Sequence, residues 1–339
     1  MFNNKTILVT GGTGSFGQEF IKTILIKYKL KKLIIYSRDE LKQSLIQKDL
    51  FFLKYSKIMR FFIGDVRDKE RLELALNGVD YVVHAAALKQ VNAAEYNPFE
   101  FIKTNIMGAQ NVIDASIKKK VKKVIALSTD KAASAINLYG ATKLASDKLM
   151  VASNAYSKPQ TCFSVVRYGN VFGSRGSVAE IFLKNVKTKK KLCITHPNMT
   201  RFHITLPQSV KFVMNCFKLM KGGEIFVPKI PSFRVVDLII AISGTKNPKV
   251  IGIRPGEKLH EEMVSSSDSI NTMEFKDYFC ILTKLERMKV NFKKKKTFPK
   301  KCEESFSYTS FNNSHYLKVS ELNYMIIKIK KWLKIKNKL

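Results

Sequence analysis

The chain has 339 residues, of which 45% are hydrophobic, so it can form one large α/β unit or two domains with a sizeable core. Five cysteines without a CxxC spacing argue against a disulfide framework or a zinc site and favour a reducing compartment. The formal net charge is +33, but only ten of the 60 basic residues are arginines, the residue type that base and phosphate readout favours. We therefore interpret the charge as a lysine-rich solvated surface that would steer an anionic substrate, and we expect no nucleic-acid partner.

Six short apolar runs alternate with helical patterns in the first half of the chain. The predicted strands cover residues 5–9, 32–37, 60–66, 79–86, 121–128 and 161–171. Strands and helices that alternate at this spacing predict an α/β fold with a doubly wound parallel sheet of the Rossmann type. After about residue 172 the regularity breaks, which predicts a smaller C-terminal α/β part.

The N-terminus runs directly into the first strand pattern without an apolar leader, and no apolar run approaches 18 residues. We therefore expect a cytoplasmic protein with no membrane partner. The four-lysine run 293–296 is predicted to be a surface loop.

A glycine-rich turn, GGTGSFG at residues 11–17, follows the first predicted strand and opens a helix. Gly11 permits the tight turn, Gly14 lets the backbone approach a pyrophosphate, and Gly17 lets the helix pack against the strand. Phosphates are favoured at such a helix N-terminus by its N–H groups and dipole. The turn predicts a dinucleotide site, with further contacts from Thr13, Ser15 and Phe16.

The second predicted strand ends in YSRDELK, which bears on the choice between NAD and NADP. An acid at the strand tip would take a ribose 2′-hydroxyl, whereas a 2′-phosphate favours Arg, Ser or Lys. Ser37, Arg38 and Lys42 match the phosphate, and Asp39 is predicted to cap the next helix. We therefore favour NADP. The remaining predicted cofactor contacts follow later strands: Asp65, Val66, Ala85, Ala86, Leu127 and Ser128.

Tyr139 and Lys143 lie four residues apart in a predicted helix, so they share one face. An ammonium near the phenol lowers its pKa, which lets tyrosine accept a hydroxyl proton as a hydride leaves carbon. With the glycine turn, this pair resembles the proton-handling pair of the short-chain dehydrogenase/reductase superfamily. The alternative is a surface tyrosine and lysine without a role.

Asp130 and Lys131 stand side by side nine residues before Tyr139. Once a sugar C4 hydroxyl is oxidised to a ketone, the C5 hydrogen becomes acidic. A base can then remove it, and an acid can protonate the departing C6 hydroxyl. Lys131 as the base requires a lowered pKa, and Asp130 as the acid requires a raised one. The alternative is a local ion pair at a helix start.

The stretch STDKAASAINLYGATKLASDKL carries a closer resemblance, together with AEYNPFEFIKTNIMGAQNVI, RYGNVFGSRGSV, GGEIFVPKIPS and RPGEKLHEEM. From about residue 5 to about residue 325, the chain resembles the inverting UDP-N-acetylglucosamine 4,6-dehydratases, which are extended short-chain dehydrogenase/reductases. The resemblance implies bound NADP, Lys131 as C5 base, Asp130 as C6 acid, inversion at C5, a homo-oligomer and the first step toward pseudaminic acid. It also implies contacts to the UDP-sugar or the nicotinamide from Lys89, Asn170, Val171, Arg201, Arg254 and Glu257. For the two arginines, surface salt bridging is the alternative.

The domain prediction combines these observations. An NADP-binding Rossmann domain is predicted over residues 1–171, with returns to the sheet around 205–245, and a substrate-binding part over 172–204 and 246–339.

This sequence departs from the family pattern at three positions: Asn92 and Ala135 replace expected prolines, and His203 replaces an expected aromatic residue. We predict that the His203 ring fills the aromatic slot rather than acting as a base. Two other functions remain open. One is a nucleotide-sugar epimerase or reductase, and the other is a non-catalytic Rossmann protein that binds RNA.

Overall fold

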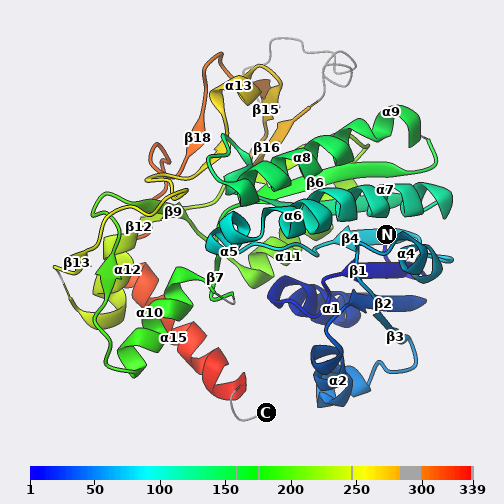
Figure 1. The fold of residues 1–339 in the computed structure, drawn as a ribbon, viewed down its shortest axis with the longest axis horizontal. Coiled ribbons are helices and arrows are strands. Elements are labelled where there is room, and N and C mark those ends of the chain that lie inside the picture. The colour runs from blue at the N-terminus through cyan, green and yellow to red at the C-terminus, as the bar shows by residue number, and fades with distance from the viewer. Residues whose placement is uncertain (158, 175, 246, 283–298, 337–339) are drawn as a thin grey trace.

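The structure, a computed structural model, describes residues 1–157, 159–174, 176–245, 247–282 and 299–336. In this part of the chain, the largest element is a sheet of ten strands in the order β17-β15-β16-β11-β6-β5-β4-β1-β2-β3 (Figure 1). The seven strands from β3 to β11 are parallel, which confirms the predicted doubly wound sheet. These strands are β1 (Thr6–Thr10), β2 (Lys32–Ser37), β3 (Met59–Ile63), β4 (Tyr81–His84), β5 (Lys123–Thr129), β6 (Cys162–Tyr168) and β11 (Ile225–Pro228).

Helices cover both faces of this sheet because alternate strand residues point to opposite faces. In β1, Ile7 and Val9 belong to one buried cluster and Leu8 to the other. The first face is covered by α1 (Ser15–Lys27), α2 (Glu40–Lys48), α3 (Leu50–Leu53) and α11 (Leu206–Leu219). The second is covered by α4 (Lys69–Ala75), α7 (Gly108–Lys118) and α8 (Leu138–Ala152). Shorter helices accompany them: α5 (Val91–Tyr96), α6 (Pro98–Phe101), the π-helix η1 (Ile102–Met107) and α9 (Asn154–Ser157).

A smaller part packs around a third apolar cluster that includes Phe182, Leu238 and Leu322. Its helices are α10 (Val178–Lys187), α12 (Val235–Ser243) and α15 (Val319–Lys336), which lie together in Figure 1. Pairs of short strands connect it to the sheet: β7 (Val171–Phe172) with β10 (Ile204–Thr205), β8 (Cys193–Ile194) with β13 (Lys249–Val250), β9 (Thr200–Phe202) with β12 (Ser232–Arg234), and β14 (Glu262–Val264) with β18 (Tyr308–Thr309). The short helix α13 (Ser266–Ser269) follows β14.

Some segments do not lie in the part of the molecule to which the predicted domain boundaries assign them. Between 205 and 245 only β11 joins the main sheet, whereas α12 packs into the smaller part. Conversely, β15 (Thr272–Glu274), β16 (Tyr278–Ile281) and β17 (Lys300–Lys301) extend the main sheet beyond β11 as antiparallel strands. Strand β16 pairs with the β11 edge, whose backbone groups would otherwise lack partners, and β15 and then β17 follow it outward. The two-part division remains a prediction, and the run 293–296 lies outside the described residues.

Three parallel strands end earlier than predicted, and this positions the site. Strands β3, β4 and β6 end at Ile63, His84 and Tyr168. The residues that follow therefore form loops at the carboxyl edge of the sheet, where ligands bind in doubly wound folds.

All five cysteines are free. Across the described ranges, no helix combines the length and apolar character needed to cross a membrane. The same ranges hold no group of three or more His, Cys, Asp or Glu side chains that could bind a metal ion.

Candidate active site

A cavity of about 770 Å³ opens at the carboxyl edge of the parallel strands and is closed on its other side by the smaller part. Of the predicted site residues, Asp130 does not line it, and the others do. The predicted cofactor contacts on its wall are Gly11, Thr13, Gly14, Ser15, Phe16, Gly17, Ser37, Arg38, Asp39, Lys42, Asp65, Val66, Ala85, Ala86, Lys89, Leu127, Ser128, Tyr139, Lys143 and Val171. The predicted substrate contacts on its wall are Lys89, Asn170, Arg201, Arg254 and Glu257.

Two glycines of the turn lie too close to neighbouring backbone to carry a side chain. Gly11 has φ +65°, and a Cβ added there would lie 2.8 Å from the Ala86 nitrogen. A Cβ on Gly17 would lie 2.6 Å from the Cα of Gly12, so glycine is needed for the helix to pack this closely. No side chain caps α1 and its first turn contains no acid. These features fit a pyrophosphate at the helix N-terminus.

The end of β2 carries the residues that bear on NADP. The Ser37 hydroxyl lies 2.8 Å from that of Thr13, and Arg38 is exposed and pairs with Asp65 at 3.5 Å. The carboxylate of Asp39 accepts a hydrogen bond from the backbone N–H of Lys42 and pairs with the Lys42 side chain, which confirms the predicted helix cap. A carboxylate bound in this way is less suited to hold a ribose 2′-hydroxyl.

Tyr139 and Lys143 lie in the first half of α8 and are both buried. Burial raises the pKa of Tyr139 to about 12, and the positive charge of Lys131 opposes that rise. The prediction that an adjacent ammonium leaves this pKa lowered is therefore wrong for this structure, because loss of solvent outweighs the charge. Burial also lowers the pKa of Lys143, while Asp147 one helical turn further on acts in the opposite direction.

Asp130 and Lys131 form a short 3₁₀ turn, η2 (Asp130–Ala132), directly after β5. Asp130 is fully buried, and its Oδ1 lies 3.1 Å from Nζ of Lys131. Its Oδ2 has no hydrogen-bond partner among the described residues. Burial raises the pKa of Asp130 even though Lys131 lowers it, and this is the direction a general acid requires.

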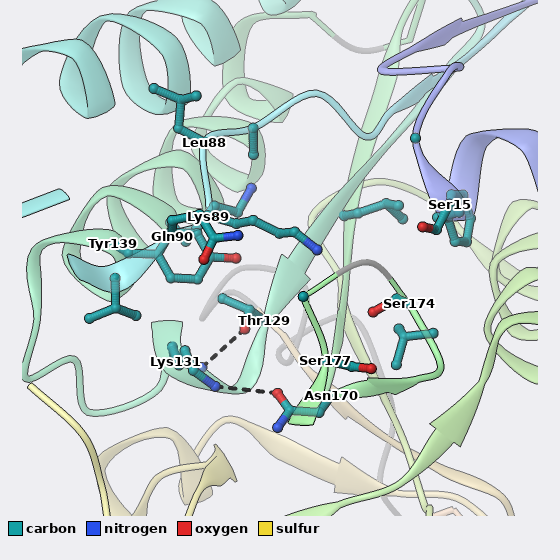
Figure 2. A pocket seen from close by; sticks show the side chains of 18 of the residues that line it. Ser15, Leu88, Lys89, Gln90, Thr129, Lys131, Tyr139, Asn170, Ser174 and Ser177 are labelled. Atoms are coloured by element: carbon teal, nitrogen blue, oxygen red, sulfur yellow. Dashed lines mark hydrogen bonds between the residues drawn. The ribbon is translucent and has the colours of Figure 1, made fainter. Parts of the chain in front are cut away.

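Lys131 points into the cavity and contacts Asn170 at 3.4 Å (Figure 2). Burial by itself would lower the pKa of Lys131, but the charges of Asp130 and Glu261 outweigh it and raise the pKa above its usual value. The structure therefore does not provide the lowered pKa that a lysine base requires. Two carboxylates, one of them distant in sequence, stabilise the ammonium.

Glu261 is the functional candidate that sequence reasoning missed. It lies in the motif RPGEKLHEEM, but nothing in its spacing separates it from the neighbouring acids. In the structure it is 2% exposed, lines the cavity, and lies 2.9 Å from Lys131. Arg201 is also buried, with contacts to Glu257 at 3.4 Å and Glu261 at 3.6 Å. Because Arg201 is buried, the alternative of a salt bridge at the protein surface does not apply to it. Arg254, in contrast, is exposed at the cavity wall.

Figure 2 shows the cavity between two groups of side chains. Lys89 and Tyr139 lie on one side, and Asn170 and Ser177 lie on the other. The loop that carries Ser177 leads into α10 and belongs to the smaller part. The wall of the cavity thus comes from both parts of the molecule.

The three departures from the family pattern lie in different environments. His203 is buried against Phe172, with ring centres 4.7 Å apart, and neither of its ring nitrogens has a hydrogen-bond partner among the described residues. His203 does not line the cavity, which confirms the prediction that its ring fills an aromatic position rather than acting as a base. Asn92 is exposed at the cavity wall, and Ala135 is half-buried beside Gly140.

Comparison with known proteins identifies the family. The family described as "Polysaccharide biosynthesis protein" matches residues 7–283. A UDP-N-acetylglucosamine 4,6-dehydratase (inverting) of Campylobacter jejuni is 55% identical over 95% of this chain and 97% of its own length. A UDP-glucose 4-epimerase of Rickettsia prowazekii is 41% identical over 96% of both chains.

A solved structure, Pen from Bacillus thuringiensis, has a TM-score of 0.86 and 36% identity and covers 97% of this chain and 99% of its own. The chain therefore belongs to the family of polysaccharide biosynthesis proteins that includes the inverting UDP-N-acetylglucosamine 4,6-dehydratases, which confirms the predicted family.

Proposed function

We propose that this protein catalyses the NADP-dependent 4,6-dehydration of UDP-N-acetylglucosamine with inversion at C5. The observation that carries the proposal is the position of Asp130 and Lys131. They follow β5, and Lys131 shares one cavity with Tyr139 and Lys143. An epimerase needs the tyrosine pair alone, whereas a dehydratase needs a second acid and base. The 55% identity to a dehydratase of this specificity supports the choice.

The cofactor would lie along the carboxyl edge of β1, β2 and β4. The glycine turn and the N-terminus of α1 would hold its pyrophosphate, and Ser37, Arg38 and Lys42 would hold a 2′-phosphate. A nicotinamide, when bound, would supply the redox chemistry, hydride removal at sugar C4 and hydride return at C6. The return at C6 requires a proton from solvent at C5, and its addition to the opposite face inverts that carbon. The net result is loss of one water without net oxidation.

Tyr139 would accept the proton of the C4 hydroxyl. Its high pKa keeps it protonated in the structure, so the proton must move onward or be shared as the hydride leaves. The positive charge of Lys131 opposes the rise in the pKa of Tyr139 and would favour the phenolate. Ser128 is held nearby by a 2.7 Å hydrogen bond to Asp147.

Asp130 and Lys131 would carry out the elimination. Lys131 takes the proton from C5, and Asp130 gives a proton to the departing C6 hydroxyl, so that water leaves. Burial supports the protonated form of Asp130. Asp130 lies behind the cavity wall, so this role requires its carboxyl group to move toward the substrate.

The UDP-sugar would extend from the nicotinamide toward the smaller part. Arg254 and Arg201 would contact the diphosphate, Glu257 would help to hold the nucleotide, and Lys89 and Asn170 would contact the sugar. We also propose that the product enters pseudaminic acid synthesis and that the enzyme acts in the cytoplasm as a homo-oligomer. These statements rest on the family resemblance.

Incubation of the purified protein with UDP-N-acetylglucosamine in D₂O tests the function. We expect loss of one water, one deuterium at C5 and no accumulation of NADPH, with NMR coupling constants that show inversion at C5. A C4 epimer without loss of water would instead establish the epimerase. Unchanged substrate and no bound cofactor would contradict both enzymatic functions and make salt-dependent RNA retention the next measurement.

A further inference from the structure

Glu261 is a buried carboxylate that contacts two cations of the proposed site. Its Oε1 lies 2.9 Å from Nζ of Lys131 and 3.6 Å from Nε of Arg201. Its Oε2 is buried and has no hydrogen-bond partner within the described ranges. A buried carboxylate is costly unless it is paired, so these two cations are what keeps it ionised.

The three N–H donors of the Lys131 ammonium group are matched by three acceptor oxygens. Its Nζ has one oxygen from each of Asp130, Asn170 and Glu261 at 3.1, 3.4 and 2.9 Å. An ammonium group has three N–H donors and no lone pair. The amine must therefore give up a proton and turn its lone pair toward the cavity before it can accept the C5 proton. The negative charge of Glu261 opposes that loss.

The same charge acts on Asp130. Burial raises the pKa of Asp130, Lys131 lowers it, and Glu261 raises it. One carboxylate thus stabilises the protonated form of both members of the proposed acid–base pair. It also holds the amine at a fixed place at the cavity wall.

We propose that Glu261 is a positioning residue for the Asp130–Lys131 pair: it fixes the Lys131 amine in place and sets the pH range in which the pair transfers protons. The inference rests on the proposed dehydratase function and deepens it. Other ionisable groups also face the pair, and they remain in place when Glu261 is changed: Tyr139 on α8, Arg201 on β9, and Lys258 from the segment before β14. Glu257 contacts Arg201.

The sign of the expected effect is the same for both groups. Removing the charge of Glu261 makes Lys131 easier to deprotonate and Asp130 easier to ionise. Lys131 must be neutral to act as a base, so the pH at which this activity appears moves to a lower value. Asp130 must be protonated to act as an acid, so the pH at which this activity is lost also moves to a lower value. Both limbs of a bell-shaped profile therefore move to lower pH, by about one unit or more for a charge this close. A purely structural role would lower the profile without moving it.

The pH dependence of kcat and KM for Glu261→Gln, Glu261→Asp and wild type provides the main test. The matched control is Glu262→Gln, because Glu262 is the next residue and bonds Ser134 instead of Lys131. We expect both limbs to shift to lower pH in Glu261→Gln, with kcat changed more than KM. Glu261→Asp should restore the wild-type limbs, and Glu262→Gln should keep them. Unmoved limbs in Glu261→Gln would overturn the proposal.

A second readout does not depend on turnover. Neutral amines react with acetic anhydride, so the extent of acetylation of Lys131 against pH, read by peptide mass spectrometry, reports its protonation; exposed Lys54 serves as the internal reference. Labelling of Lys131 should begin at lower pH in Glu261→Gln than in wild type and Glu262→Gln. If the wild type forms no product, the proposed function fails, yet this comparison still decides the role of Glu261. Identical labelling curves would contradict it.

Discussion

Arg167 and Asp147 form an ion pair at 3.3 Å that is almost completely shielded from solvent, with side-chain exposures of 2% and 1%. Asp147 lies one helical turn beyond Lys143 on α8 and also accepts a 2.7 Å hydrogen bond from Ser128. Arg167, on β6, donates to the carbonyl of Met263 on β14. The pair thus joins β5, β6 and α8 to β14, which lies far away in the sequence.

We predict that Asp147→Asn destabilises the fold by about 3 kcal/mol, because the buried guanidinium of Arg167 then keeps only one counter-charge, the partly exposed Asp268 at 3.4 Å. Urea denaturation measures this loss. Asp114→Asn is the control, since Asp114 pairs with Lys69 at the surface and should cost less than about 1 kcal/mol. Equal stability of the two variants would show that the buried pair contributes little.

Tyr139→Phe should reduce product formation by a factor of about 100 or more, because the C4 hydroxyl then has no proton acceptor. Bound cofactor, measured by absorbance after denaturation, should stay at the wild-type level. Deuterium exchange at C5 should also disappear, since C5 becomes acidic only after oxidation at C4. The exposed Tyr156→Phe is the control. Exchange that persists in Tyr139→Phe would assign the oxidation step to another residue.

Arg38→Ala should weaken NADPH binding about tenfold and leave NADH binding unchanged, because only NADPH carries the 2′-phosphate. Fluorescence titration of each nucleotide gives the two dissociation constants. Arg60→Ala serves as the matched variant, because Arg60 donates to the carbonyls of Lys57 and Met59. A parallel loss of NADH affinity would argue against a 2′-phosphate contact.

His203→Phe should raise stability at pH 7 by about 1 kcal/mol, because it removes two buried ring nitrogens that have no partner among the described residues. It should also reduce the sensitivity to acid. Burial lowers the pKa of His203 to about 4, whereas the unfolded chain takes up the proton near pH 6.5. The wild type therefore loses stability as the pH falls from 6.5 to about 4, by up to about 1.4 kcal/mol per pH unit for this group.

Urea midpoints at pH 7 and pH 5 check this prediction. His84 remains in the variant, and burial lowers its pKa to about 3, so part of the acid sensitivity should persist. An unchanged difference between the two midpoints would mean that His203 does not titrate on unfolding in this range.

Local patterns in the sequence were sufficient for much of the fold. Strand β2 was predicted at its observed bounds, Lys32–Ser37, because it is an apolar run with clear breaks at both ends. Strands that were predicted too long, such as 60–66, end early where glycine and polar residues turn into loops. Strands β15–β17 were not predicted, because they are short and join the sheet only where β16 pairs with β11, which is distant in the sequence.

The sequence by itself determined which chemical groups share a local element. Helical spacing placed Tyr139 and Lys143 on one face, chain adjacency placed Asp130 beside Lys131, and the glycine turn marked the start of α1. Only the tertiary structure decided the protonation of these groups, because pKa values depend on solvent exclusion and on charges from distant segments. Glu261 reaches Lys131 from a segment 130 residues further along the chain, and burial raises the pKa of Tyr139. No local pattern encodes those contacts, so the sequence predicted the reactive groups and the fold determined their state.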